Sequence, residues 1–196
     1  MNKSSINRLI IIVLVIILSN HSIAQRTFEV IREKSSISVS GTSTLHNWEM
    51  PLQDYRCNLL IDIYNPSITI KKVDFKGISK SLKSDYSVMD KKTYKALKAD
   101  TYKEIQFASS YPEEIPLGSK SFKGEIAGSL FIGGVTKSIT LFYTGKIISD
   151  ELIRVTGSKK LAMTEFNIDP PTAMLGTLKT GDEVVIKFNL ILKQLK

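Results

Sequence analysis

The residues best suited to catalysis in positions 25–196 are a single histidine, His46, and a single cysteine, Cys57. Histidine is the commonest general acid or base, and a thiolate is a strong nucleophile. A lone histidine cannot supply the several ligands of a multi-histidine metal site. Cys57 shares a face of CNLLIDI with alternate aliphatic residues, which favours a buried thiol over a reactive one. We therefore expect no enzyme and no catalytic residue; a lipid-modifying enzyme with His46 as acid or base is the least favoured alternative.

Phosphate-binding and hydrolase motifs do not change this expectation. The sequence has no GxSxG, Walker A or GxGxxG pattern placed before a helix. Residues 133–138 (GGVTKS) are rich in glycine but join two predicted strands, so they lack the helix N-terminus that a phosphate loop needs. We expect no metal and no required cofactor.

His46 and Trp48 form the most distinctive local pair. They have the same parity, so they share a face if a strand has begun by residue 46. They can lie at the mouth of a cavity, with the indole against a bound chain and the imidazole near its polar head. Alternatively, Trp48 closes the end of a filled core and His46 binds a backbone carbonyl. The same two interpretations, cavity wall or ordinary core, apply to Tyr86, Met89 and Phe107.

The first 24 residues have the three parts of a secretory signal peptide. A basic start (MNKSSINR) precedes ten aliphatic residues, and small residues then place a cleavage site before Gln25. The aliphatic run is shorter than the ~20 residues of a membrane span. We predict a cleaved signal over 1–24, one domain over 25–196, and a periplasmic or secreted protein; an uncleaved anchor is the alternative.

Charge narrows the choice of partners. The formal net charge of +8 falls to +6 when Lys3 and Arg8 leave with residues 1–24. The lysines are scattered, without an arginine-rich block, so we expect no nucleic acid partner. Peripheral contact with an anionic membrane surface is compatible with this charge, as is a simple solvated surface.

Most of the chain alternates apolar and polar residues with period two, which is typical of half-buried strands. The clearest case is 121–148, where two such runs flank Gly133 and Gly134 and predict a hairpin. In one register Ile132 faces Ile139 and Gly128 faces Tyr143. The other predicted strands are 26–33, 36–42, 48–63, 67–78, 104–108, 151–163 and 183–193. A change of phase at Lys71-Lys72 predicts a β-bulge.

One segment breaks the strand pattern. Residues 88–99 (VMDKKTYKALKA) favour a short helix, with Asp90 as its cap. Lys91, Lys95 and Lys98 line one side of it, either as a solvated face or as a surface for an anionic group. Many antiparallel strands with one helix predict an all-β barrel or sandwich.

Four ordered segments together resemble the YceI-like family of exported, lipocalin-like proteins. They are SSISVSGTSTLHNWEM (35–50), LKSDYSVMDKKTYKALKADTYKEIQF (82–107), GSLFIGGVTKSITL (128–141) and PPTAMLGTLKTGDEVVIKFNL (170–190). The resemblance implies an extended antiparallel β-barrel of eight strands with one short helix. It also implies an apolar cavity that holds a polyisoprenoid or isoprenoid quinone for storage or transport.

We therefore expect a hydrophobic small-molecule ligand, and the oligomeric state stays open. Glycines on the inward faces, Gly124, Gly128 and Gly145, would leave room for that ligand or admit a neighbouring ring. A filled, non-catalytic barrel that binds a partner protein is the main alternative. The candidate ligand-binding residues are His46, Trp48, Phe75, Tyr86, Met89, Phe107, Gly128, Leu130, Leu141, Tyr143 and Phe188.

Overall fold

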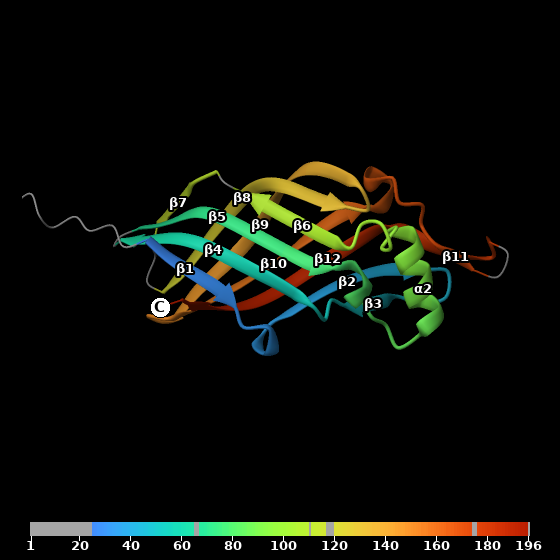
Figure 1. Ribbon diagram of the computed structural model, residues 1–196, viewed down its shortest axis with the longest axis horizontal. Helices are drawn as coiled ribbons and strands as arrows, with labels where there is room; N and C mark the ends of the chain where they lie inside the picture. The colour runs from blue at the N-terminus through green and yellow to red at the C-terminus, as the bar shows by residue number, and fades with distance from the viewer. Residues whose placement is uncertain (1–24, 65–66, 110, 117–119, 174–175, 196) are drawn as a thin grey trace, which may run out of the picture.

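The computed structural model describes residues 25–64, 67–109, 111–116, 120–173 and 176–195. The predicted signal peptide lies outside these residues. The described chain forms a closed antiparallel barrel in which eight strands follow one another around the wall in the order β1-β4-β5-β6-β8-β9-β10-β12, and β12 pairs again with β1. The barrel is elongated, with helix α2 across one end (Figure 1). The prediction of an eight-stranded antiparallel barrel is confirmed.

The wall strands are β1 (Gln25–Val30), β4 (Tyr55–Tyr64), β5 (Ser67–Ile78), β6 (Glu104–Ser109), β8 (Ser121–Ile132), β9 (Val135–Ser149), β10 (Leu152–Ala162) and β12 (Leu178–Gln194). The strands β2 (Ser36–Ser43) and β3 (Trp48–Pro51) extend this sheet beside β12, whereas β7 (Glu113–Pro116) pairs with β5 and β11 (Thr172–Ala173) with β12. The helical segments are η1 (Arg32–Lys34), η2 (Ser79–Ser81), α2 (Ser87–Ala96) and η3 (Met163–Phe166).

The long strand β12 holds both ends of the molecule together. Its C-terminal part pairs with β1 and its N-terminal part with β2, and η1 interrupts the chain between these two partners. The Ile31 N–H donates to the Ile191 carbonyl at 2.7 Å, so the interruption is fixed to β12. Beyond it, β2 and β3 lengthen the sheet at the end where α2 lies (Figure 1).

The predicted single strand 48–63 is wrong, because the chain forms two strands, β3 and β4, with residues 52–54 between them. The Leu52 N–H still donates to the Ile37 carbonyl at 2.9 Å, but the Gln53 N–H donates to Ser81 at 3.0 Å. Leu52 also forms an isolated bridge with Leu82. The chain therefore leaves β2, meets the segment before α2, and then pairs with β1.

The predicted bulge is confirmed. Leu60 pairs with Lys72 and Ile61 pairs with Ile70, so Lys71 is the extra residue on β5. Its ammonium lies 3.3 Å from a carboxylate oxygen of Asp62, a buried residue on β4. The bulge thus restores the inward phase of β5 and points a lysine at a buried acid.

The hairpin β8–β9 is present, but the expected register is wrong by four residues. Ile132 pairs with Val135, Gly128 with Ile139, and Gly124 with Tyr143. The turn is the two residues Gly133 and Gly134, whose φ values are 57° and 94°. Positive φ at both central residues is the geometry of a type I′ turn, which matches the twist of the flanking strands and selects glycine.

Candidate functional site

A large cavity of ≈ 690 Å³ lies inside the described barrel. Residues of α2 and of the β2–β3 connection are among those that line it, at the end of the barrel where α2 lies. Its wall comes from the inward residues of β2, β4–β6, β8–β10 and β12, which alternate with outward residues because the side-chain period of a strand is two. Representative lining residues are Ile37, Leu59, Val73, Ile126, Val155 and Leu190. The wall is therefore almost entirely aliphatic and aromatic.

Ten of the eleven predicted site residues line this cavity; the exception is Gly128. The ten are His46, Trp48, Phe75, Tyr86, Met89, Phe107, Leu130, Leu141, Tyr143 and Phe188. They come from segments far apart in the sequence, and the closed barrel together with the packing of α2 brings them to one cavity. Whether they contact a ligand stays a prediction.

Gly128 is excluded from the cavity surface by Phe107. A Cβ at residue 128 would lie 2.5 Å from Phe107 Cζ and 2.6 Å from the Ala108 carbonyl oxygen. The Phe107 ring thus occupies the space that the missing side chain leaves. The expectation that Gly128 pairs with Tyr143 is also wrong, since Tyr143 lies over Gly124 instead.

Glycines elsewhere in the wall accept rings in the same way. Gly157 lies under the ring of Phe188, which faces it directly across the β10–β12 pair. Gly145 lies under Phe122, and Gly124 under Tyr143, on the β8–β9 pair. The glycines therefore do not form hollows of their own; they let aromatic side chains lie flat against the wall.

The mouth of the cavity is formed by the β2–β3 connection and the segment that leads into α2. Leu45, Tyr86 and Val88 line the cavity and are also 69%, 65% and 64% exposed. His46 lies on the same rim with an exposed side chain, and its backbone forms a turn with Ser43. Within the described part of the chain, the His46 imidazole forms no hydrogen bond or ion pair.

Trp48 closes part of the wall beside the mouth. Its indole N–H donates to the Thr42 carbonyl at 3.1 Å, and its ring covers Gly41 on the paired strand. The side chain is half-buried and lines the cavity. Trp48 therefore lies at the wall of an open cavity and does not close the end of a filled core, and its contact with a bound chain stays a prediction.

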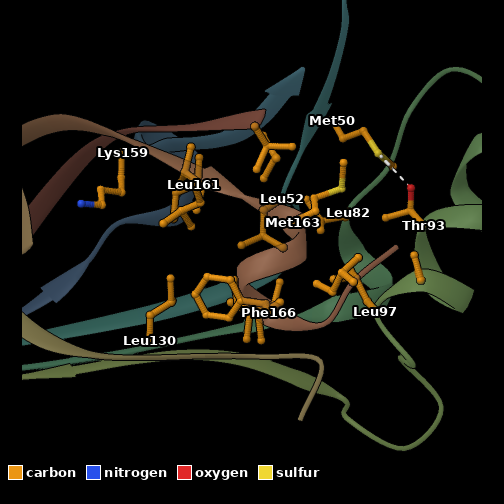
Figure 2. A pocket seen from close by; sticks show the side chains of 18 of the residues that line it. Met50, Leu52, Leu82, Thr93, Leu97, Leu130, Lys159, Leu161, Met163 and Phe166 are labelled. Atoms are coloured by element: carbon orange, nitrogen blue, oxygen red, sulfur yellow. Dashed lines mark hydrogen bonds between the residues drawn. The ribbon is translucent and has the colours of Figure 1, made fainter. Parts of the chain in front are cut away.

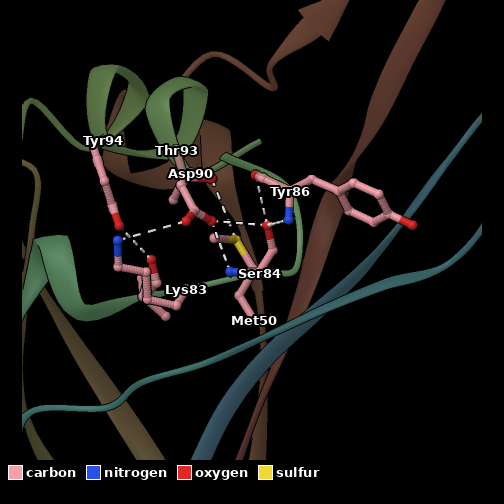
Figure 3. A network of polar contacts seen from close by, with 8 residues as sticks. Met50, Lys83, Ser84, Tyr86, Asp90, Thr93 and Tyr94 are labelled. Atoms are coloured by element: carbon pink, nitrogen blue, oxygen red, sulfur yellow. Dashed lines mark hydrogen bonds and ion pairs between the residues drawn. The ribbon is translucent and has the colours of Figure 1, made fainter. Parts of the chain in front are cut away.

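Helix α2 is held over the mouth by contacts at its first turns (Figure 3). Asp90 is buried, and its Oδ1 accepts hydrogen bonds from the Ser84 N–H at 2.7 Å and the Ser84 hydroxyl at 2.8 Å. The predicted role of Asp90 as helix cap is wrong: Tyr86 is the N-cap and Asp90 lies inside the first turn. Its carboxylate instead fixes the loop before the helix, which places Tyr86 on the rim.

Two further contacts attach the helix to the barrel. The Thr93 hydroxyl lies 3.4 Å from the sulfur of Met50 on β3, and the Tyr94 hydroxyl donates to the Leu82 carbonyl at 3.0 Å. Figure 2 shows Met50 and Thr93 joined across the opening, beside Leu82 and Leu97. Met89 and Leu97 line the cavity from this side, so α2 is part of its wall.

At the other end, a polar contact lies behind the aromatic wall. The Tyr143 hydroxyl donates to Glu113 Oε2 at 3.0 Å, and the Glu125 N–H donates to Glu113 Oε1 at 2.9 Å. Burial raises the pKa of Tyr143, and the Glu113 carboxylate adds to this. Tyr143 is thus held as a protonated donor, and β7 is tied to the β8–β9 hairpin.

Cys57 is buried and lines the cavity, as its strand position predicted. Burial raises the pKa of its thiol to about 12, with a smaller contribution from Asp74. The nucleophilic form of cysteine is the thiolate. Near neutral pH this thiol stays protonated and inert, which agrees with the buried interpretation.

Several residues of the cavity wall were not predicted from the sequence. Lys159 lies on β10 with the inward parity of Val155 and Leu161, and all three line the cavity. Figure 2 shows Lys159 near Leu161. The 151–163 alternation could have revealed it. Phe166, in η3, is 1% exposed and also lines the cavity. It follows the predicted strand 151–163, and its apolar side chain was its only sequence signal.

The described residues contain neither a cluster of metal ligands nor a helix that could span a membrane. No group of histidine, cysteine or acidic side chains there could hold a metal ion. No helix in that part of the chain is long and apolar enough to span a membrane.

Comparison with known proteins places this barrel in a family. Among curated proteins, none matches the chain. Of solved structures, BcnA from Burkholderia cenocepacia is 18% identical with a TM-score of 0.64, over 83% of this chain and 98% of that one. A polyisoprenoid binding domain from Saccharophagus degradans, implicated in plant cell wall breakdown, is 11% identical with a TM-score of 0.63, over 85% and 97%.

A YceI protein from Campylobacter jejuni is 21% identical with a TM-score of 0.52, over 74% of this chain and 83% of that one. At these identities the three structures show that the fold is shared. The model of the YceI-like domain matches residues 26–192, which is nearly the whole described barrel. The chain therefore belongs to the YceI-like family.

Proposed function

We propose that this protein is an exported carrier or store of a long apolar molecule, a polyisoprenoid or an isoprenoid quinone, held in the barrel cavity. The observation that carries the proposal is the apolar cavity of ≈ 690 Å³. Its size lies within the ~300–1,000 Å³ usual for small-molecule sites. Membership of the YceI-like family and the likeness to a polyisoprenoid binding domain support this class of ligand.

The cavity size suits a slender chain. At about 30 Å³ for each group the size of a water molecule, the cavity accepts about 20 such groups. Burial of that many methylene-sized groups at ~0.8 kcal/mol each gives a gross gain of about 16 kcal/mol. Association costs ~4–15 kcal/mol. The gross gain exceeds the low end of this cost by about 12 kcal/mol and the high end by about 1 kcal/mol, so apolar contact favours binding across the range.

Export rests on residues 1–24, whose basic, aliphatic and small-residue parts are typical of a cleaved signal peptide. We infer a periplasmic or secreted protein that acts by binding. The N-terminal sequence of the purified protein tests this directly: a chain that begins at Gln25 supports cleavage, and one that keeps residues 1–24 contradicts it.

The ligand is tested by native mass spectrometry of protein purified without detergent, followed by addition of a long-chain prenol or quinone. Val155→Trp places an indole in the cavity, and Arg154→Trp places one on the outer face of the same strand. Uptake should fall in the first variant and not in the second. A barrel that is always empty and takes up neither compound would refute the proposed function.

A further inference from the structure

We propose that the mouth of the cavity is a docking face for an anionic phospholipid membrane, an inference that rests on the proposed function. Three apolar side chains at the mouth are exposed to solvent and also belong to the cavity wall. Leu45, Tyr86 and Val88 are among the most exposed large apolar side chains of the described residues, and all three also line the cavity. They come from two segments about 40 residues apart, so the fold gathers them at one opening.

The conformation of this rim is fixed before any membrane contact. The Ser84 hydroxyl lies 3.0 Å from the Tyr86 carbonyl oxygen and accepts from the Tyr86 N–H at 3.1 Å. Asp90 binds Ser84 in turn. Figure 3 shows the Tyr86 ring directed away from these contacts and from helix α2. These contacts therefore hold the loop whose exposed Tyr86 forms the apolar tip of the rim. A tyrosine at a membrane surface places its ring among the headgroups.

Positive charge lies beside this apolar tip. Lys91 and Lys95 are exposed on the outer side of α2, four residues apart on one face. The predicted helical face of three lysines is wrong at Lys98, which follows the helix with a φ of 50° and is also exposed. Within the described residues none of the three forms an ion pair, whereas the nearby Lys80 is paired with Asp100 at 2.5 Å. Asp85, next to Tyr86, is an acidic residue of the same rim. Unpaired lysines around exposed apolar groups are the pattern of a surface that lies on anionic lipid.

The position of the cavity explains why contact between this surface and a bilayer would be useful. A long prenyl chain is almost insoluble in water, so its transfer from a bilayer is easiest when the opening of the carrier touches the bilayer. Val88 and Lys92, one turn apart on α2, both line the cavity at its mouth. Lys92 donates to the Thr172 carbonyl, which links α2 to the β11 segment on the far side of the opening. The docking face and the entrance are therefore one structure.

The test measures co-sedimentation of the purified protein with vesicles of phosphatidylglycerol in phosphatidylethanolamine, against vesicles of phosphatidylcholine alone. Each lysine close to an anionic surface contributes about fivefold in affinity. The Lys91→Gln, Lys95→Gln, Lys98→Gln triple variant should bind the anionic vesicles about a hundredfold more weakly. The matched control, Lys123→Gln, Lys146→Gln, Lys193→Gln, changes the charge equally on exposed wall positions and should bind as the parent does.

The apolar half of the face has its own variant. Leu45→Ser with Val88→Ser should weaken binding to anionic vesicles, whereas Tyr111→Ser, at a residue 72% exposed elsewhere, should not. Equal binding to neutral vesicles, or equal binding by either mouth variant and its control, would overturn the docking proposal. Mass spectrometry measures ligand occupancy separately and so distinguishes the two proposals. A protein that contains lipid but does not bind vesicles refutes docking alone. A protein that binds vesicles but never contains lipid refutes the carrier function alone.

Discussion

Replacement of Gly128 by alanine should destabilise the barrel by forcing the Phe107 ring off the wall. The new Cβ would lie 2.5 Å from Phe107 Cζ, 2.7 Å from Phe107 Cε2 and 2.6 Å from the Ala108 carbonyl oxygen. The ring can rotate toward the cavity, but the carbonyl belongs to β6 and cannot move without the sheet. Overpacking of this kind costs ~1–3 kcal/mol in the free energy of unfolding.

For a domain of this size the melting temperature falls by roughly 2–4 °C for each kcal/mol. Thermal unfolding should therefore show a decrease of about 2–12 °C for Gly128→Ala. Ser129→Ala is the matched control, because Ser129 is exposed on the outer face of the same strand. Such surface changes usually stay within ~0.5 kcal/mol.

A double-mutant cycle with Phe107→Leu separates the two contacts. Without the ring, Gly128→Ala should cost less, and the remaining cost belongs to the Ala108 carbonyl. We expect a coupling energy of ~0.5–3 kcal/mol, the usual range for residues in contact. A Gly128→Ala variant as stable as the parent, or one whose cost is the same with and without Phe107, would refute the close packing of this ring on Gly128.

Three further predictions concern the polar groups of the barrel. Burial raises the pKa of Cys57 from 9.0 to about 12, so the free energy of unfolding should fall as pH rises from about 9 to about 12. In urea titrations across that range, the free energy of unfolding of Cys57→Val should fall less. Parallel curves for the two proteins would contradict this. Tyr143→Phe removes a hydroxyl that donates to Glu113 and should cost ~1 kcal/mol in thermal unfolding, whereas Tyr111→Phe, on the surface, should cost nothing measurable. The Lys159 ammonium lines the cavity and forms no hydrogen bond or ion pair with the described residues, so it is available to an anionic headgroup. In a competition assay, Lys159→Met should weaken binding of a long-chain prenyl acid more than binding of the matching alcohol. An equal effect on both would rule out a headgroup contact.

The residues of the barrel wall could be predicted because the inward side chains of each strand follow from its own alternating sequence. Parity placed Phe107, Leu141 and Phe188 on inward faces, and the phase change at Lys71-Lys72 located the bulge. These are local properties, since alternate residues of a strand point to the same side. The same rule includes Lys159, which has the parity of Val155 and Leu161 although its side chain is charged.

Contacts between strands were harder to predict, because they depend on register. The Gly133-Gly134 pair favours a two-residue turn, so turn chemistry could have given the observed pairing of Ile132 with Val135. The break at residues 52–54 had no such local cause. It arises because Ser81, nearly 30 residues later, replaces the strand partner of that segment. The role of Asp90 differs from the predicted cap for a local reason: its carboxylate binds Ser84, in the loop before the helix.

The register also explains why so narrow a barrel is hollow. Eight strands enclose an interior that side chains can just fill, and this wall carries several phenylalanines. Phe188 faces Gly157 directly, and Phe107 lies over Gly128, so both rings lie along the wall where a larger neighbour would turn them toward the axis. Aromatic side chains that cover glycines on a paired strand are a recurrent way to protect a sheet.

At the Glu113 end of the barrel, pairs of glycine and aromatic residues close the interior. Phe122 faces Gly145 and Tyr143 faces Gly124, and the two rings meet edge to face at 6.4 Å. Neither Phe122 nor its glycine belongs to the cavity surface, so the space stops where these rings pack together. The exposed lining residues, by contrast, lie at the end that α2 covers. Glycine–aromatic pairs therefore set the shape of the site, keeping the middle of the barrel open and its Glu113 end closed, and a bound chain would enter and leave past Tyr86.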